Sequence, residues 1–244
     1  ATGAAPAPQL SGIQQEAFNK IKGSYTAAPG KPVLLRGVTG SGKTKVIMKA
    51  IDRCIADRKT VIMLVPEISL TPQTVGYFCS QYGERVAVIH SSLSAGERYD
   101  AWRRIRDGLA DVVIGTRSAV FAPLPSVGLI VIDEEQEHTY KSDANPKYLA
   151  HDVARFRCAH HKGLMLLASA TPSVNSYYKA KSGKYTLIEM KQRYGRATLP
   201  HVIVTDMRGE AGGGMLSPLG HTLKERLTET VAADKQAIVF LNRR

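Results

Sequence analysis

Residues 32–44 read "PVLLRGVTGSGKT", a short apolar run that leads into a glycine-rich loop. The loop, residues 37–44, fits the pattern G-x-x-x-x-G-K-[ST] without a mismatch, and a helical pattern follows it over residues 43–58. A strand before the loop and a helix after it are the context that this motif requires. Backbone N–H groups of such a loop curl around phosphate oxygens, and the helix N-terminus adds partial positive charge. The stretch therefore predicts a phosphate-binding loop.

Single residues of the loop have distinct expected roles. Lys43 is expected to reach the β- and γ-phosphates of a nucleotide, and Thr44 to hold Mg²⁺ through its hydroxyl. The other nucleotide-binding positions that we predict in the loop are Gly37, Thr39, Gly40, Ser41 and Gly42. A chance glycine-rich turn is the alternative, and the flanking strand and helix make it the minor one.

Further apolar runs recur along the chain at residues 60–66, 85–90, 110–116, 128–133 and 163–170. Helical patterns lie between most of them, for example over residues 96–108. Because crossovers between parallel strands place helices on the faces of a sheet, this alternation predicts an α/β fold, a mainly parallel sheet with helices on both faces. Ligands of such sheets bind at the carboxyl ends of the strands.

The run "IVIDEEQEHTYK", residues 130–141, ends in three adjacent carboxylates, Asp133, Glu134 and Glu135. Charges at the end of a buried strand are costly unless a cation or a hydrogen-bond donor meets them. A nucleotide-bound Mg²⁺ takes one or two protein carboxylates, so Asp133 is predicted to hold Mg²⁺. Glu134 is predicted to orient and deprotonate the attacking water. Lys43, Asp133 and Glu134 are thus the predicted catalytic residues; an ion pair is the alternative for Asp133.

Two weaker features lie on other strands. The stretch "LASATPS", residues 167–173, places Ser169 and Thr171 at a strand end. Their hydroxyls can sense the γ-phosphate or the water. Gln14 lies ahead of the first strand, and its amide can pair with N6 and N7 of adenine. Taken alone, a core Ser-Ala-Thr and an exposed glutamine are both ordinary.

Composition limits the classes of protein. Lys and Arg number 33 against 21 Asp and Glu, giving a net charge of +12, which favours a polyanionic partner or a basic soluble surface. No apolar run approaches the roughly 18 residues of a membrane span, and the N-terminus lacks a signal-peptide pattern. The three cysteines have no metal-site spacing, which predicts a reducing compartment without zinc or disulfides. We expect a cytoplasmic location and no membrane contact.

The alternation of apolar runs and helical patterns ends after about residue 183. Residues 184–190 and 201–207 are predicted strands, and the three glycines at 212–214 predict a boundary. Beyond it come a predicted helix, 218–235, and one apolar run, 236–244. We therefore predict a linker or cloning-derived end at 1–9, one domain over 10–210, and the beginning of a second domain over 211–244.

Several motifs together resemble those of superfamily 2 helicases and, within them, of bacterial replication-restart DNA helicases. They are Gln14, the loop at 37–44, "LVPEISLTPQ" (64–73), "HSSLSAGER" (90–98), "GTRSAVFAPL" (115–124), "DEEQ" (133–136) and "SATPS" (169–173). The resemblance implies a RecA-like P-loop NTPase lobe that uses ATP and Mg²⁺, followed by the start of a second lobe. It also implies a fragment of a longer ATP-dependent helicase, whose zinc ligands lie outside this chain. Implied partners are single-stranded and forked DNA, primosome proteins and single-strand-binding protein.

The same resemblance assigns roles to single residues. Gln14 would contact adenine, while Ser169, Ala170 and Thr171 would couple hydrolysis to movement. The positions expected along the DNA strand are Pro66, Glu67, Gly115, Thr116, Arg117, Tyr140 and Lys141, with Tyr148 as a second base-stacking residue.

Gln136 is the one departure from the resemblance, because the family usually has histidine there. Glutamine both donates and accepts hydrogen bonds, so the coupling role is expected to remain. Two alternatives stay open: another nucleic-acid translocase, and a non-catalytic binding module. The second would have lost Lys43, Thr44, Asp133 or Glu134, yet all four are present. Because a second lobe supplies the arginine at the γ-phosphate, we expect this chain alone to bind ATP and hydrolyse it very slowly.

Overall fold

The computed structural model describes residues 10–27, 30–193, 201–207 and 219–241. Seven strands form one sheet in the order β3-β4-β2-β5-β6-β1-β7, and all six pairings between neighbouring strands are parallel. The strands are β1 Val33–Gly37, β2 Thr60–Leu64, β3 Val86–Ile89, β4 Val112–Gly115, β5 Val127–Asp133, β6 Leu164–Ser169 and β7 Thr186–Met190. The predicted fold class is confirmed, and each predicted strand up to residue 190 is present.

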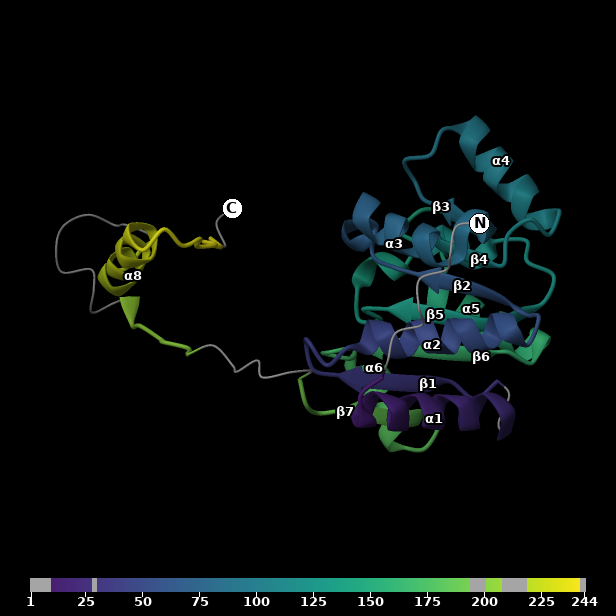
Figure 1. The fold of residues 1–244 in the computed structure, drawn as a ribbon, viewed down its shortest axis with the longest axis horizontal. Helices are drawn as coiled ribbons and strands as arrows, with labels where there is room; N and C mark the ends of the chain where they lie inside the picture. Colours follow the sequence, from purple (N-terminus) through teal and green to yellow (C-terminus); the bar gives the residue numbers. More distant parts are fainter. Residues whose placement is uncertain (1–9, 28–29, 194–200, 208–218, 242–244) are drawn as a thin grey trace. The chain divides into compact units, whose positions relative to one another are not determined.

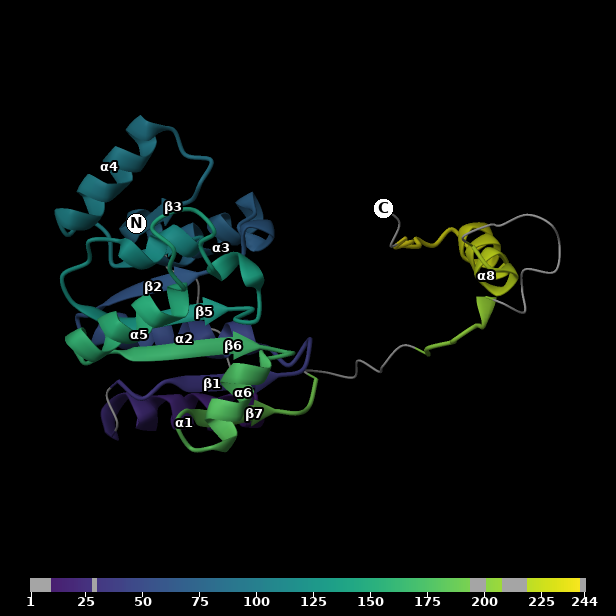
Figure 2. The same cartoon turned by 180° about the vertical axis from the view of Figure 1, so that it is seen from behind.

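Helices cover both faces of the sheet (Figures 1 and 2). One face packs against α1, α2 and α3, and the other against α4, α5 and α6. These helices are α1 Gly12–Ala27, α2 Lys43–Ala56, α3 Pro72–Tyr82, α4 Ala95–Arg106, α5 Ala150–His161 and α6 Val174–Lys181. Four short 3₁₀ turns are η1 Glu67–Ser69, η2 Gly83–Arg85, η3 Arg117–Phe121 and η4 His138–Tyr140.

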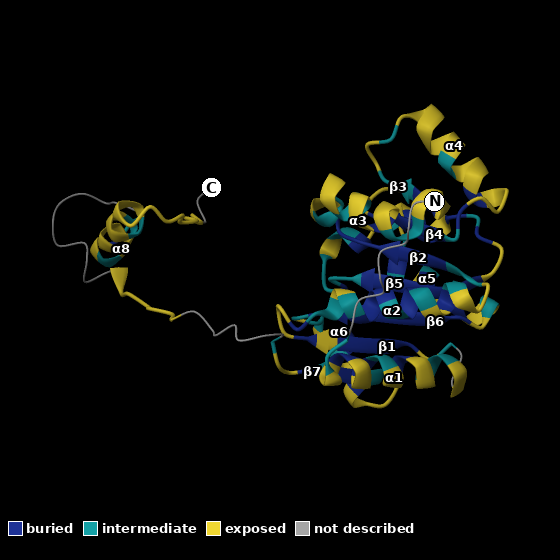
Figure 3. Cartoon of the chain, viewed as in Figure 1, coloured by how far each residue is buried: buried dark blue, intermediate teal, exposed yellow. Residues whose placement is uncertain are grey.

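The strands are apolar on both sides because both sides are buried. In β1, Val33 and Leu35 pack into one core and Leu34 into the other, as the two-residue period of a strand requires. Figure 3 shows the sheet as the mostly buried layer, with exposed residues mainly on helices and loops, and Arg36 is the exposed residue of β1. The strand β5 is buried from Val127 to Ile132 and reaches partial exposure only at Asp133. The first carboxylate of the acidic run therefore lies where the sheet meets its carboxyl edge.

Contacts divide the chain into two units, Ala1–Ala197 and Thr198–Arg244. In the second unit, α8 spans His221–Ala232, inside the predicted helix. Residues 201–206 and 236–241 are not strands, so both strand predictions there are wrong for the described residues. An apolar run becomes a strand only beside a partner that completes its hydrogen bonds, and no described residue of this unit provides one. The predicted boundary at 212–214 and the predicted linker at 1–9 lie outside the described residues.

Among the helices of the described segments, none has the length and apolar character needed to cross a membrane. The division of the chain into a first lobe and the start of a second remains a prediction.

Candidate functional site

The glycine-rich loop joins β1 to α2 at the carboxyl edge of the sheet. Gly40 and Gly42 have φ angles of 79° and 83°, a region that side chains with a Cβ rarely occupy. The space around two of the glycines also excludes a side chain. A Cβ on Gly42 would lie 2.2 Å from Nε2 of Gln14, and one on Gly37 would lie 2.6 Å from Oγ of Ser41. The glycines are therefore required by the path of the loop.

Gln14 supports the loop from α1. Its side chain is buried, its Nε2 donates to the Ser41 carbonyl at 3.1 Å, and its Oε1 accepts from the Ser11 N–H at 2.9 Å. The structure thus places Gln14 beside the loop, a position that its place in the sequence does not specify. Its amide is engaged with the protein here, and the contact with adenine stays a prediction.

The polar groups of the loop surround a space suited to an anion. Lys43 Nζ donates to the Gly37 carbonyl at 2.8 Å, which holds the ammonium over the loop. Ser41 Oγ is buried without a hydrogen-bond partner, while Thr39, Gly40 and Thr44 are exposed. A bound phosphate would give these groups acceptors, so the residues present fit a nucleotide phosphate.

The order β5-β6-β1 brings the acidic run to the loop. Asp133 pairs in register with Ala168 of β6, and Ser169 of β6 pairs with Arg36 of β1, so Asp133 and the loop are separated by a single strand. Burial and the neighbouring Glu134 raise the pKa of Asp133, against the opposing effects of the Glu134 N–H and Lys43. A divalent cation beside this carboxylate would reverse that shift and stabilise its charge.

Glu134 occupies an unusual backbone conformation at the turn after β5. Its φ is 44°, in the left-handed region that disfavours residues other than glycine. The turn is closed by the Glu137 N–H, which donates to the Glu134 carbonyl at 2.9 Å. Outliers of this kind gather at functional sites, where the surrounding structure holds them.

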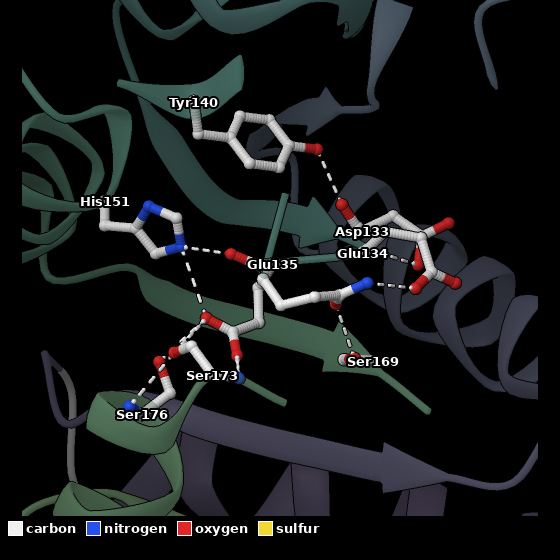
Figure 4. A network of polar contacts seen from close by, with 9 residues as sticks. Asp133, Glu134, Glu135, Tyr140, His151, Ser169, Ser173 and Ser176 are labelled. Carbon is white, nitrogen blue, oxygen red and sulfur yellow. Dashed lines mark hydrogen bonds and ion pairs between the residues drawn. The ribbon is translucent and has the colours of Figure 1, made fainter. Parts of the chain in front are cut away.

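The predicted coupling residues form one chain of hydrogen bonds. Gln136 Nε2 donates to Glu134 Oε2 at 3.0 Å, and Ser169 Oγ donates to Gln136 Oε1 at 2.6 Å. The Thr171 N–H in turn donates to Ser169 Oγ at 2.9 Å, with Ala170 between them. Gln136 uses both ends of its amide to connect the end of β5 to the end of β6 (Figure 4), as its donor and acceptor chemistry allows.

Glu135 has a role that sequence reasoning missed. Its side chain is buried and accepts from the Ser173 N–H at 2.7 Å and from Ser176 Oγ at 2.8 Å. His151 Nε2 lies 3.4 Å from its carboxylate. Burial alone would raise the pKa of Glu135, but the hydrogen bonds from His151, Ser176 and Ser173 outweigh it and the pKa is lowered. Glu135 therefore joins the acidic turn to the start of α6 (Figure 4).

Tyr140 corrects one prediction. The side chain is only 1% exposed, and its hydroxyl donates to the Asp133 carbonyl at 2.6 Å. Burial and the charge of Asp133 raise its pKa. A ring without an exposed face cannot stack on a base, so the base-stacking prediction is wrong for this structure. Tyr140 instead fixes the carboxyl end of β5.

A cleft of about 590 Å³ opens beyond the ends of β2, β3 and β4. Four residues predicted to contact DNA line it: Glu67, Thr116, Arg117 and Lys141. Pro66 is buried at the start of η1. Gly115 is required by packing, because a Cβ there would lie 2.0 Å from the Ile89 carbonyl.

Arg117 is held at the wall of this cleft. Its Nη1 donates to the carbonyls of Thr139, at 3.2 Å, and Lys141. Its guanidinium lies 5.7 Å from the ring centroid of Tyr148. The contacts fix the direction of the arginine and tie it to the loop that follows the acidic run. The cleft is thus linked by covalent chain and hydrogen bonds to Asp133 and Glu134.

Among the described residues, no group of three or more His, Cys, Asp or Glu side chains is arranged to hold a metal ion by itself. A nucleotide-bound Mg²⁺ does not need such a group, because phosphates and waters supply most of its ligands. Thr44 and Asp133 fit that smaller requirement. The prediction of no zinc in this chain stays a prediction.

Comparisons with known proteins show the family of this chain. Residues 11–180 match the family described as DEAD/DEAH box helicase. The chain is 45% identical over 235 residues to the replication restart protein PriA of Bacillus subtilis, covering 96% of this chain and 29% of that protein. It is 40% identical over 239 residues to PriA of Chlamydia trachomatis, covering 97% and 32%. The resemblance inferred from the motifs is confirmed, and the chain spans about a third of the length of these relatives.

A solved structure supports the fold independently. The structure of RecG bound to a three-way DNA junction matches with a TM-score of 0.56 and 25% identity, covering 77% of this chain and 24% of RecG.

Proposed function

Because the chain belongs to the DEAD/DEAH box helicase family, we propose that it is the ATP-binding motor lobe of a DNA helicase of replication restart. The whole protein would couple ATP hydrolysis to DNA unwinding and assemble a primosome at stalled forks. The similarity to two replication restart proteins supports the choice of pathway. Cytoplasmic location is part of the same proposal.

One observation supports the ATP assignment. The strand β6 lies between β5, which ends at Asp133, and β1, which leads into the phosphate-binding loop, so both features lie at the same edge of the sheet. Lys43 would bind the phosphates, and Thr44 and Asp133 would hold Mg²⁺. The metal, when bound, would neutralise charge on the phosphates. Glu134 would orient the attacking water and accept its proton. Gln14, held against Ser41, is the proposed adenine contact at the rim of the loop.

Coupling to DNA would use the hydrogen-bond chain at the ends of β5 and β6. Glu134 is connected through Gln136 to Ser169 and Thr171, so a change at the attacking water reaches the start of α6. A second connection would lead toward DNA. The acidic run continues along the chain to residues 139–141, whose carbonyls accept hydrogen bonds from Arg117 at the wall of the cleft. We propose that Pro66, Glu67, Gly115, Thr116, Arg117 and Lys141 line the path of a DNA strand.

The proposed partners are single-stranded and forked DNA, primosome proteins and single-strand-binding protein. Residues 10–210 are proposed as the first lobe and 211–244 as the start of a second. The arginine that a second lobe adds in such motors is worth about 10³–10⁵ in turnover. The 244-residue chain should therefore bind ATP and hydrolyse it very slowly, with little stimulation by DNA.

Calorimetric titration of Mg-ATP into the chain and into Lys43→Ala tests the assignment. The Lys43 side chain is partly exposed and its ammonium donates to the Gly37 carbonyl, so its removal should weaken binding tenfold or more while urea unfolding changes little. Lys49→Ala, further along α2, is the matched control and should bind as wild type. Equal ATP affinity in Lys43→Ala and the unchanged chain would refute the nucleotide site.

A further inference from the structure

The helix α4 presents a face that nothing in the described structure covers. Ile105 is its only buried residue and Ala101 is partly buried, while the others are exposed. Figure 3 shows the helix mostly in the exposed colour. Two aromatic side chains lie on this surface, Tyr99 at 60% exposure and Trp102 at 40%. Exposed large aromatics spaced three residues apart on a helix are neighbours on one face.

Each ring carries an arginine one helical turn further on. The Arg103 guanidinium lies 5.9 Å from the centroid of Tyr99, and that of Arg106 lies 5.1 Å from the centroid of Trp102. The face therefore alternates π surfaces with guanidinium groups, of which that of Arg106 also pairs with the Asp107 carboxylate at 2.9 Å. Cation–π contacts stabilise exposed helices, which is the ordinary explanation for such pairs.

Other features of α4 also stabilise the helix. Ser94 and Glu97 form a complete capping box, which satisfies N–H groups at the start of the helix. Arg103, Arg104 and Arg106 in the last turn suit the negative end of the helix dipole. A helix already capped at its start and charged at its end holds its form without a tryptophan on its outer surface. The aromatic pair is available for a partner.

The face is continuous with the cleft. Arg98 and Trp102 line the same cleft as Arg117 and Lys141. Arg98 is held in place by hydrogen bonds from its Nη2 to the carbonyls of Ser91 and Leu93. Three cations, Arg98, Arg117 and Lys141, thus line the cleft with two carboxylates, Glu67 and Asp143, and Trp102 connects the cleft to the outer face of α4.

We propose that Tyr99 and Trp102 stack on bases of single-stranded DNA where it leaves the cleft, with Arg103 and Arg106 contacting its phosphates. The surface is suited to a single strand because unpaired bases expose π faces, and duplex DNA exposes only phosphates and groove edges. Stacking on every kind of base would make the contact independent of sequence. The inference rests on the proposed function, since the cleft must hold DNA for the strand to reach α4.

Trp102 reports on its own contact, because it is the only tryptophan of the chain. Titration with oligo-dT of about 20 nucleotides should quench its fluorescence, and the effect should weaken steeply as salt rises. Anisotropy of fluorescein-labelled oligo-dT measures total binding in parallel. A blunt duplex of equal length should quench much less. Equal quenching by the duplex would overturn the assignment to a single strand.

Variants separate stacking from charge. Trp102→Ala should weaken oligo-dT binding by about tenfold, and Trp102→Phe, which keeps a ring, should restore most of the affinity. Tyr178→Ala removes an aromatic residue of α6 that is more exposed than Trp102, 68% against 40%, and is the control that should have no effect. Two results, with labelled DNA still bound, would overturn this inference alone: Trp102 fluorescence of the unchanged chain that is not quenched by oligo-dT, and wild-type affinity for labelled oligo-dT in Trp102→Ala. Failure of the chain to bind labelled DNA at all would overturn the proposed function instead.

Discussion

Replacing Glu135 with alanine should destabilise the chain more than any other change in the acidic run. The carboxylate accepts from Ser173 N, Ser173 Oγ and Ser176 Oγ at 2.7, 3.2 and 2.8 Å, with His151 beside it. Its removal leaves the buried Ser176 hydroxyl and the partly buried Ser173 donors without this acceptor, and it takes away the bond to the N–H of Ser173, the N-cap residue of α6. Removing one partner from a buried charged network costs about 3–5 kcal/mol, and we expect a loss of that size.

Urea unfolding followed by far-UV circular dichroism measures the effect. Glu135→Gln keeps one acceptor oxygen and should lose about 1–3 kcal/mol. Glu137→Ala, two residues on, is the control. Its carboxylate lies 3.9 Å from His138 in an exposed pair, and the change should stay within about 0.5 kcal/mol. A loss below about 1 kcal/mol in Glu135→Ala would refute the reasoning that this carboxylate anchors α6.

Three further outcomes are expected. The pKa of Glu135 is lowered from 4.5, so the stability that its carboxylate contributes is complete above that pH and is lost as pH falls through the folded-state pKa. The stability difference between the unchanged chain and Glu135→Gln, measured in urea titrations, should therefore shrink below about pH 4. Gly42→Ala should weaken ATP binding and stability more than Gly40→Ala, because both positions have positive φ but only the first places its Cβ against Gln14; equal effects by calorimetry would contradict this. Tyr140→Phe should cost about 0.5–1.5 kcal/mol by urea unfolding through loss of the hydrogen bond to Asp133, and a neutral result would show that the hydroxyl does not hold β5.

Local pattern was enough to predict the sheet and the loop. A buried parallel strand is an uninterrupted apolar run, and the glycines at 40 and 42 have positive φ as the loop motif requires. The acidic run could be assigned to the same edge because parallel strands end together. These features depend on neighbours in sequence and on one rule of topology, so no knowledge of side-chain packing was needed.

The roles of Glu135 and Tyr140 depend on packing. Glu135 meets Ser173 and Ser176, which lie 38 and 41 residues further along the chain, and nothing in its own surroundings distinguishes it from Glu134. Tyr140 was read as a loop residue, although η4 turns its ring into the core below β5. The strand predicted at residues 201–206 was wrong for the opposite reason. The apolar alternation of a strand is present there, but no described strand of this unit lies beside it to pair with.

The Mg²⁺ dependence of ATP binding tests the central claim most directly. Asp133 is partly buried at the carboxyl end of β5, its pKa is raised, and Lys43 of the phosphate-binding loop is near enough to oppose that rise. ATP affinity measured by calorimetry should rise as Mg²⁺ is added to the unchanged chain, and Asp133→Asn, which keeps the size of the side chain, should lose most of that gain. An Asp133→Asn variant whose ATP affinity rises with Mg²⁺ as in the unchanged chain would contradict the account.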